Sequence, residues 1–197
     1  ASDIPWIISV WDLPQWMYEG PRRGRWDPGR RIAPGQWDEV VESVVSYLDY
    51  ARRVYRAEPD FFSFNECGEG VRVLLSPEEH RDMIARLGAE FTRRGLKTRF
   101  LLGDSATAGG THQYALRAAG EGDILKYVGA LSVHSWGGGT AADWQAWQSA
   151  GKTLERPVFV AEMGVDPDAW RTPWIMEEYA YALRELRLYQ EIVQFLR

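Results

Sequence analysis

The sequence predicts an α/β protein built on the pattern of a (β/α) TIM barrel. Short apolar segments alternate with segments of helical periodicity, and each apolar segment stops at a polar side chain. In a parallel barrel such side chains gather at the carboxyl ends of the strands, where barrel enzymes carry their chemistry. A doubly wound open sheet is the rival arrangement. Neither GxGxxG nor GxxxxGK[ST], the phosphate loops typical of such sheets, occurs, which favours the barrel.

The first two strands are predicted at 5–10 and 61–64, with a helix between them. The first ends at Trp11 and Asp12, and a loop rich in Gly, Pro and Arg follows it. The second has Phe at three of its four positions and ends at Asn65-Glu66. The helix is predicted from apolar residues at helical spacing: Val40, Val44, Leu48, Ala51 and Tyr55.

The next helix has the clearest boundaries in the chain. Ser76 is a capping residue, Pro77 suits the first helical position, and Glu79 completes a capping box. Gly95 is expected to end this helix. A third strand at 98–102 follows and ends at Gly103-Asp104-Ser105.

The second half of the chain repeats the alternation. A helix is expected from about Gln113 to Val128, and then a strand at 130–133 that ends at His134-Ser135-Trp136. Thr140 and Asp143 should cap a helix that stops at Gly151 and places Trp144 and Trp147 in the core. The last strand, 158–161, ends at Glu162, and Thr172-Pro173 should begin the final helix.

Composition excludes several classes of function. The chain has 197 residues, 45% of them hydrophobic, which is enough for a buried core. A net charge of −5 argues against nucleic acid as the main partner, and the absence of a long apolar run argues against a membrane span. The single cysteine, Cys67, excludes an internal disulfide and has no His/Asp arrangement that would make it a nucleophile. His80 and His112 are given no role, no cofactor is expected, and the oligomeric state is left open.

Two carboxylates at strand ends, Glu66 and Glu162, suggest the reaction. Glycosidic bonds are cleaved by a pair of carboxyl groups, one of which protonates the leaving oxygen while the other attacks or activates water. The two glutamates lie three predicted βα units apart, so they should face each other across the mouth of a barrel.

Four motifs resemble the clan A glycoside hydrolases, which are retaining (β/α)8 enzymes with catalytic glutamates on strands four and seven. Phe64-Asn65-Glu66 and Ala161-Glu162 are similar to the two signatures of that clan. The segment from Trp11 to Met17 resembles the Trp-Ser-Pro-Pro-x-Trp-Met loop of family 30, and His134-Ser135-Trp136 is similar to the His-x-Tyr of family 5. Families 5, 30 and 39 all remain candidates.

The resemblance implies a role for each matching residue. Glu66 would be the general acid/base, Glu162 the nucleophile, Asn65 a partner of the sugar 2-hydroxyl, and His134 a hydrogen-bonding group of the site. Two departures stand out, because the clan usually has Pro where this chain has Cys67 and also commonly supplies a Trp from strand eight.

The resemblance also numbers the predicted strands as three to seven of eight. A full barrel needs eight strands and about 250 residues. We therefore expect residues 1–197 to be a single catalytic domain that lacks the first two strands and the last one.

Further residues on the active face are candidates for substrate binding. Aromatic rings suit the flat faces of sugars and carboxylates suit their hydroxyl groups, although packing and helix capping would explain the same residues. This group comprises Asn65, His134, Trp136, Trp11, Asp12, Asp104 and Trp170. The Arg-rich loop at 22–31 is interpreted as a solvated surface, with an anionic sugar or partner as the sharper alternative.

Two other classes of function stay open. Glu66, Asp104, His134 and Glu162 could hold Mg or Mn in an isomerase-type barrel, although no metal is our first expectation. A truncated or non-catalytic barrel that binds carbohydrate is the other class, since an open barrel exposes sheet edges. The expected partner is a carbohydrate in either hydrolase or binding module. A glycan substrate favours a secreted or periplasmic location, and a cytoplasmic one is also compatible.

Overall fold

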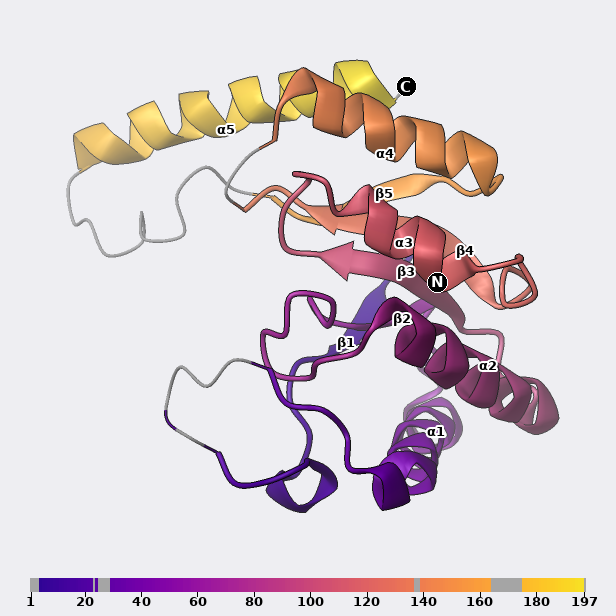
Figure 1. Ribbon diagram of the computed structural model, residues 1–197. Helices are drawn as coiled ribbons and strands as arrows, with labels where there is room; N and C mark the ends of the chain where they lie inside the picture. The colour runs from indigo at the N-terminus through magenta and orange to yellow at the C-terminus, as the bar shows by residue number, and fades with distance from the viewer. Residues whose placement is uncertain (1–3, 23, 25–28, 137–138, 164–174, 197) are drawn as a thin grey trace.

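Five parallel strands form one curled sheet in which each strand pairs with its neighbours in the sequence (Figure 1). The computed structural model describes residues 4–22, 24, 29–136, 139–163 and 175–196, without the side chains of 175–185. The strands are β1 (Ile7–Val10), β2 (Phe61–Phe64), β3 (Arg99–Ser105), β4 (Val128–His134) and β5 (Val158–Glu162). Successive parallel pairing with intervening helices is the topology of a (β/α) barrel, so the predicted fold is confirmed as a half-barrel. Within the described part of the chain, β1 pairs only with β2 and β5 only with β4.

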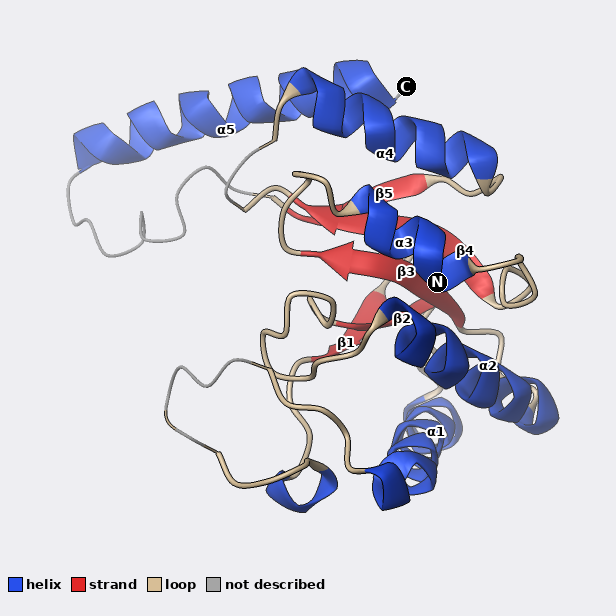
Figure 2. Cartoon of the chain, in the orientation of Figure 1, coloured by secondary structure: helices blue, strands red, loops and turns tan. Residues whose placement is uncertain are grey.

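The helices lie along the outside of the curled sheet (Figure 2). They are α1 (Trp37–Tyr55), α2 (Pro77–Arg94), α3 (His112–Ala119), α4 (Ala141–Thr153) and α5 (Ile175–Leu196). Two short 3-10 turns, Gln15–Met17 and Pro34–Gln36, precede α1. Because the strands are parallel and the helices return the chain along the outside, the carboxyl ends of the strands all lie at one end of the sheet.

The predicted helix boundaries are confirmed where the sequence supplies complete caps. The Ser76 hydroxyl accepts the N–H of Glu79, and the Glu79 carboxylate accepts the N–H of Ser76. Gly95 ends α2 in the left-handed conformation, at a φ of 68°. Thr140 and Asp143 form a second capping box at the start of α4. Each cap satisfies N–H groups that the first helical turn leaves unpaired.

Two predicted helix ends were wrong, and glycine explains both. The helix expected to reach Val128 stops at Ala119, because Gly120 and Gly122 have φ values of 56° and 90°. In contrast, α4 continues past Gly151 to Thr153. A Cβ at Gly151 would lie 2.8 Å from Val158 Cγ2, so this glycine allows the helix to approach β5 closely. The expected start of the last helix at Thr172-Pro173 falls outside the described residues.

An aromatic cluster between the sheet and the helices fixes the strands that lead to the site. Phe62 of β2 makes edge contacts with Phe64, Phe91 and Phe100, and Phe91 stacks on Phe100 at a centroid distance of 5.1 Å. Full burial of each ring stabilises the fold by about 1.5–3 kcal/mol. Trp144 and Trp147 are buried, as predicted. The rings thus pack the backbone of β2, which Glu66 follows, and of β3, which contains Asp104, against the helices behind the sheet.

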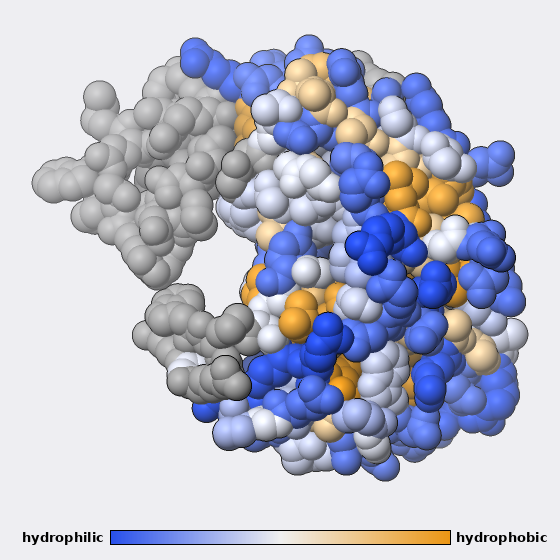
Figure 3. All heavy atoms as spheres, in the orientation of Figure 1, coloured by the Kyte–Doolittle hydropathy of each residue, from blue (hydrophilic) through white to orange (hydrophobic). Residues whose placement is uncertain are grey.

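Among the described residues, the face shown in Figure 3 is mainly hydrophilic. None of the helices in the described part of the chain combines the length and apolar character needed to cross a bilayer.

Candidate active site

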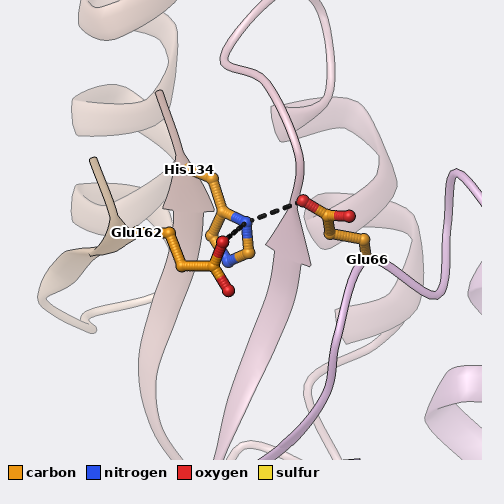
Figure 4. Close-up of side chains that lie close together, drawn as sticks. All are labelled: Glu66, His134 and Glu162. Carbon is orange, nitrogen blue, oxygen red and sulfur yellow. Dashed lines mark hydrogen bonds and ion pairs between the residues drawn. The ribbon is translucent and has the colours of Figure 1, made fainter. Parts of the chain in front are cut away.

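Glu66, His134 and Glu162 converge at the carboxyl ends of the strands (Figure 4). His134 Nδ1 donates to Glu66 Oε1 at 2.9 Å, and Glu162 Oε2 lies 3.6 Å from the same nitrogen. One atom from each of the three side chains lies within 4.8 Å of the others. The imidazole thus stands between the two carboxylates, which come from opposite sides of it.

Glu66 owes its position to an unusual backbone conformation. It follows β2 with a φ of 49°, in the left-handed region, which costs a residue with a Cβ about 1–2 kcal/mol. Its N–H donates to the carbonyl of Asp104 at 2.9 Å, and its own carbonyl accepts the N–H groups of Glu69 and Gly70. These bonds offset the strain and direct the Glu66 side chain toward β4.

Asp104 lies beneath this cluster, 1% exposed. Its Oδ2 accepts the Ser63 hydroxyl at 2.6 Å, and its Oδ1 accepts the Ser132 hydroxyl at 2.6 Å and His134 Nε2 at 3.1 Å. Burial disfavours the carboxylate, but the hydrogen bond to His134 and the His134 charge, with the two serines, outweigh it and lower the pKa of Asp104. These three hydrogen bonds involve both oxygens of the Asp104 carboxylate, which is buried behind Glu66 and His134.

His134 is charged at neutral pH. Burial of the imidazole by itself disfavours the cation, yet the hydrogen bonds to Asp104 and Glu66 and the charges of Asp104 and Glu162 raise the pKa of His134 to about 9. Both ring nitrogens therefore carry protons and donate to carboxylates. Because the ring is fully buried, it acts as a fixed positive charge beneath the two glutamates.

Glu162 closes the site from β5, and Trp136 orients it. The indole Nε1 of Trp136 donates to Glu162 Oε2 at 2.7 Å. The Glu162 side chain keeps 29% of its surface exposed, compared with 9% for Glu66. Glu162 is thus the more accessible of the two carboxylates.

The remaining candidate residues occupy different positions. Asn65 is 2% exposed, and its Nδ2 is buried without a hydrogen-bond partner among the described residues. Trp11 is 51% exposed. Asp12 accepts the N–H of Leu13 and the hydroxyl of Tyr18, and so holds the loop after β1. Trp170 lies outside the described residues.

The same three side chains could in principle hold a metal ion, as Glu66, His134 and Glu162 each offer one ligand atom. A cation at that point would have to displace the proton on His134 Nδ1 that binds Glu66, because a ligating imidazole must be neutral. The protonated ring already supplies the positive charge that balances the carboxylates.

Four residues around the site were not singled out from the sequence. Ser63 and Ser132 hold Asp104, while His80 and Tyr114 contact Cys67, the residue after Glu66. Their signal was present but weak: Ser63 and Ser132 are small polar residues inside otherwise apolar strands, one or two positions before the strand-end motifs. His80 was assigned no role because helical position alone does not show which loop it contacts.

Comparison with known proteins finds solved structures of similar fold, but no match to a family model or to a curated protein. No protein-family model matches the sequence, and no curated protein matches it. Among solved structures, the chain is similar to the endo-β-1,6-glucanase BT3312, with a TM-score of 0.68 and 16% identity over 83% of this chain and 38% of that one. SrfJ from Salmonella typhimurium gives a TM-score of 0.77 and 17% identity over 95% and 41% of the two chains. A GH30 endoxylanase from Clostridium papyrosolvens gives a TM-score of 0.62 and 14% identity, over 82% of this chain and 40% of that one.

The chain therefore spans about two fifths of the length of these solved structures. At such identities the likeness concerns the fold alone. The half-barrel of this chain therefore shares its fold with part of that endo-β-1,6-glucanase and part of that GH30 endoxylanase.

Proposed function

We propose that the chain carries the two catalytic carboxylates of a retaining glycoside hydrolase, with Glu66 as general acid/base and Glu162 as nucleophile. The observation that supports this most directly is their spacing, since oxygens of the two carboxylates lie within 4.8 Å of each other. Retaining enzymes hold their carboxyl groups about 5–5.5 Å apart, whereas inverting enzymes leave about 6.5–9.5 Å for a water molecule.

In the first step a Glu162 oxygen would attack the anomeric carbon while the bond to the leaving oxygen breaks. For this step Glu66 would be protonated on Oε2, since its Oε1 accepts the hydrogen bond from His134 Nδ1, and the Oε2 proton would pass to that leaving oxygen. The exposure of Glu162 and its bond from Trp136 Nε1 suit a nucleophile that must be both reachable and aimed.

In the second step water would attack the anomeric carbon of the glycosyl–Glu162 ester and give its proton to the Glu66 carboxylate. Glu162 would leave as a carboxylate and restore the starting state. The cationic His134 lies 3.6 Å from Glu162 and would stabilise the carboxylate as it reforms.

Asn65 would bind the substrate. A buried amide nitrogen without a hydrogen-bond partner is unfavourable unless a ligand accepts its hydrogen bond. A sugar hydroxyl is the acceptor that the resemblance implies for this position. Trp11 and Trp136 would supply aromatic surface beside it. Asp104, whose buried carboxylate already accepts three hydrogen bonds from protein groups, is better assigned to holding His134 than to contacting sugar.

Covalent trapping of the glycosyl–enzyme intermediate tests the assignment of the nucleophile. A 2-deoxy-2-fluoro glycoside with a good leaving group should label the peptide that contains Glu162, and the Glu162→Gln variant should not be labelled. The Glu66→Ala variant should lose turnover of aryl glycosides, and azide should restore it. Labelling at another carboxylate in an active enzyme would overturn the assignment of Glu162.

A carbohydrate-binding module without turnover is the second candidate, and the sheet edges favour it. Within the described residues β1 and β5 each have a single partner strand, so this half-barrel by itself leaves two edges unpaired. Turnover should be measured with this chain and with any longer protein that contains it. Binding of oligosaccharide by both without hydrolysis by either would favour the binding module.

A further inference from the structure

A buried cluster of uncharged groups lies directly behind Glu66. Cys67, the next residue, is 0% exposed, and its Sγ lies 3.5 Å from Tyr114 Oη and 3.7 Å from His80 Nδ1. Tyr114 Oη is also 3.2 Å from His80 Nδ1 and donates to the carbonyl of Leu75 at 3.1 Å. Tyr114 comes from α3 and His80 from the first turns of α2, so two helices meet the loop that carries Glu66.

The Tyr114 hydroxyl has one proton and two acceptor sites, and this cluster uses all three. The proton goes to the Leu75 carbonyl. The thiol of Cys67 and a proton on His80 Nδ1 then donate to the oxygen. Burial raises the pKa of the Cys67 thiol to about 12 and lowers the pKa of His80 to about 4, so both groups are neutral at physiological pH, as this arrangement requires.

The hydroxyl bridges the two ends of the loop between β2 and α2. It binds the side chain of Cys67 at one end and the carbonyl of Leu75 at the other. A backbone bond from the Leu75 N–H to the Cys67 carbonyl at 3.0 Å closes the same loop. The tyrosine ring also lies against Gly68, where a Cβ would come within 2.8 Å of the ring.

This bridge bears on Glu66 because of its strained backbone. A left-handed φ at a residue with a Cβ persists only when its surroundings impose it. Asp104 holds the Glu66 N–H on one side of the turn. Cys67 and Gly68, on the other side, are held by Tyr114.

We propose that the Tyr114 hydroxyl is a positioning group for Glu66, which locks the loop from Cys67 to Leu75 and so aims the Glu66 carboxylate at the leaving oxygen and at His134. The proposal rests on the acid/base role given to Glu66 above. It assigns Tyr114, Cys67 and His80 a part in the reaction although none of them reaches the substrate.

The test compares Tyr114→Phe with Tyr127→Phe. Both variants remove one hydroxyl and keep the ring, and Tyr127 likewise packs against a glycine, Gly88, but at the amino-terminal end of β4. In Tyr114→Phe the amides of residues 67–75 should exchange hydrogen about tenfold faster, and the Nδ1 resonance of His134 should move. Tyr127→Phe should change neither.

Steady-state kinetics then distinguish a loss of Glu66 positioning from a general loosening of the fold. Tyr114→Phe should lower kcat/KM about tenfold or more for glycosides with poor leaving groups, which need the acid, and less than about threefold for dinitrophenyl glycosides, which do not. Cys67→Ser, which keeps a donor toward Tyr114, should retain most of the activity that Cys67→Ala loses.

Unchanged exchange in residues 67–75 and an unmoved His134 resonance in folded Tyr114→Phe would overturn the proposal. So would equal loss of kcat/KM for both classes of leaving group. These outcomes are distinct from failure of the proposed function, which would appear as an active wild-type chain that tolerates Glu66→Ala with poor leaving groups.

Discussion

Asp104 holds His134 from below through a 3.1 Å hydrogen bond to Nε2, while the opposite ring nitrogen binds Glu66. Two serine hydroxyls fix the orientation of the Asp104 carboxylate. The arrangement is a chain of hydrogen bonds that crosses the three neighbouring strands β2, β3 and β4 and ends at the proposed acid/base. The charge of His134, and hence the electrostatics of both glutamates, depends on a residue that is 1% exposed and lies behind them.

Replacement of Asp104 by Asn should show this dependence. The substitution keeps the shape of the side chain but removes the negative charge, so the pKa of His134 should fall below its value of about 9. Activity should drop about 10- to 100-fold, as for other residues that orient a catalytic group from behind. Titration of the imidazole by NMR measures the first effect and steady-state kinetics the second.

The exposed Asp82 of α2 offers a matched control, since Asp82→Asn makes the same chemical change far from the network. A His134 pKa that is equal in Asp104→Asn and in the wild type would contradict the role given to Asp104.

The charge of His134 should also make stability depend on pH. The pKa is raised from 6.5 to about 9 on folding, so the folded protein keeps a proton that the unfolded chain releases. The stabilisation is fully present below pH 6.5 and is lost as the pH rises toward 9, and it amounts to about 3 kcal/mol. Urea denaturation across this range should show the free energy of unfolding falling with pH in the wild type and staying nearly level in His134→Gln. Parallel curves would show that His134 is not the group responsible.

Much of the fold and the centre of the site could be predicted because they rest on local patterns. Apolar runs that end at polar residues marked the strands, and complete capping boxes marked the starts of α2 and α4. Parallel strands present their carboxyl ends at one edge, so strand-end residues such as Glu66, His134 and Glu162 come together without any knowledge of the loops.

The position of Asp104 could not be predicted, because it depends on the backbone and on its neighbours across the sheet. The strand expected to stop at Leu102 continues through Ser105, with a register shift against β4 between Gly103 and Ser105. Positive φ values of 97° at Gly103 and 49° at Asp104 turn the carboxylate under the site. The cluster of Tyr114, Cys67 and His80 could not be predicted for a related reason, since it joins two helices and a loop that are distant in the sequence.

Gly103→Ala tests how closely this turn is packed. A Cβ at Gly103 would lie 3.0 Å from the Ser132 carbonyl and 3.1 Å from Trp147 Cη2, at a φ that L-residues rarely adopt. We expect the free energy of unfolding to fall by about 1–3 kcal/mol, with loss of activity as Asp104 shifts. Gly35→Ala is the matched control, because no atom lies within 4 Å of its Cβ position and its φ is not positive. If the denaturation midpoints of the two variants shifted equally, the turn at Gly103 would not be specially constrained.

Removal of metal ions separates the proposed hydrolysis from the isomerase-type alternative. If His134 works as a cation bonded to Glu66 and Asp104, no divalent ion is needed between the two glutamates. Hydrolysis of an aryl glycoside should therefore be unchanged after dialysis against EDTA, with metal content checked by mass spectrometry. Added Zn²⁺ should inhibit, since it would compete with the Nδ1 proton for His134 and draw both carboxylates away from the sugar. Loss of activity on chelation, restored by Mg²⁺ or Mn²⁺, would instead favour a metal-dependent reaction at Glu66, His134 and Glu162.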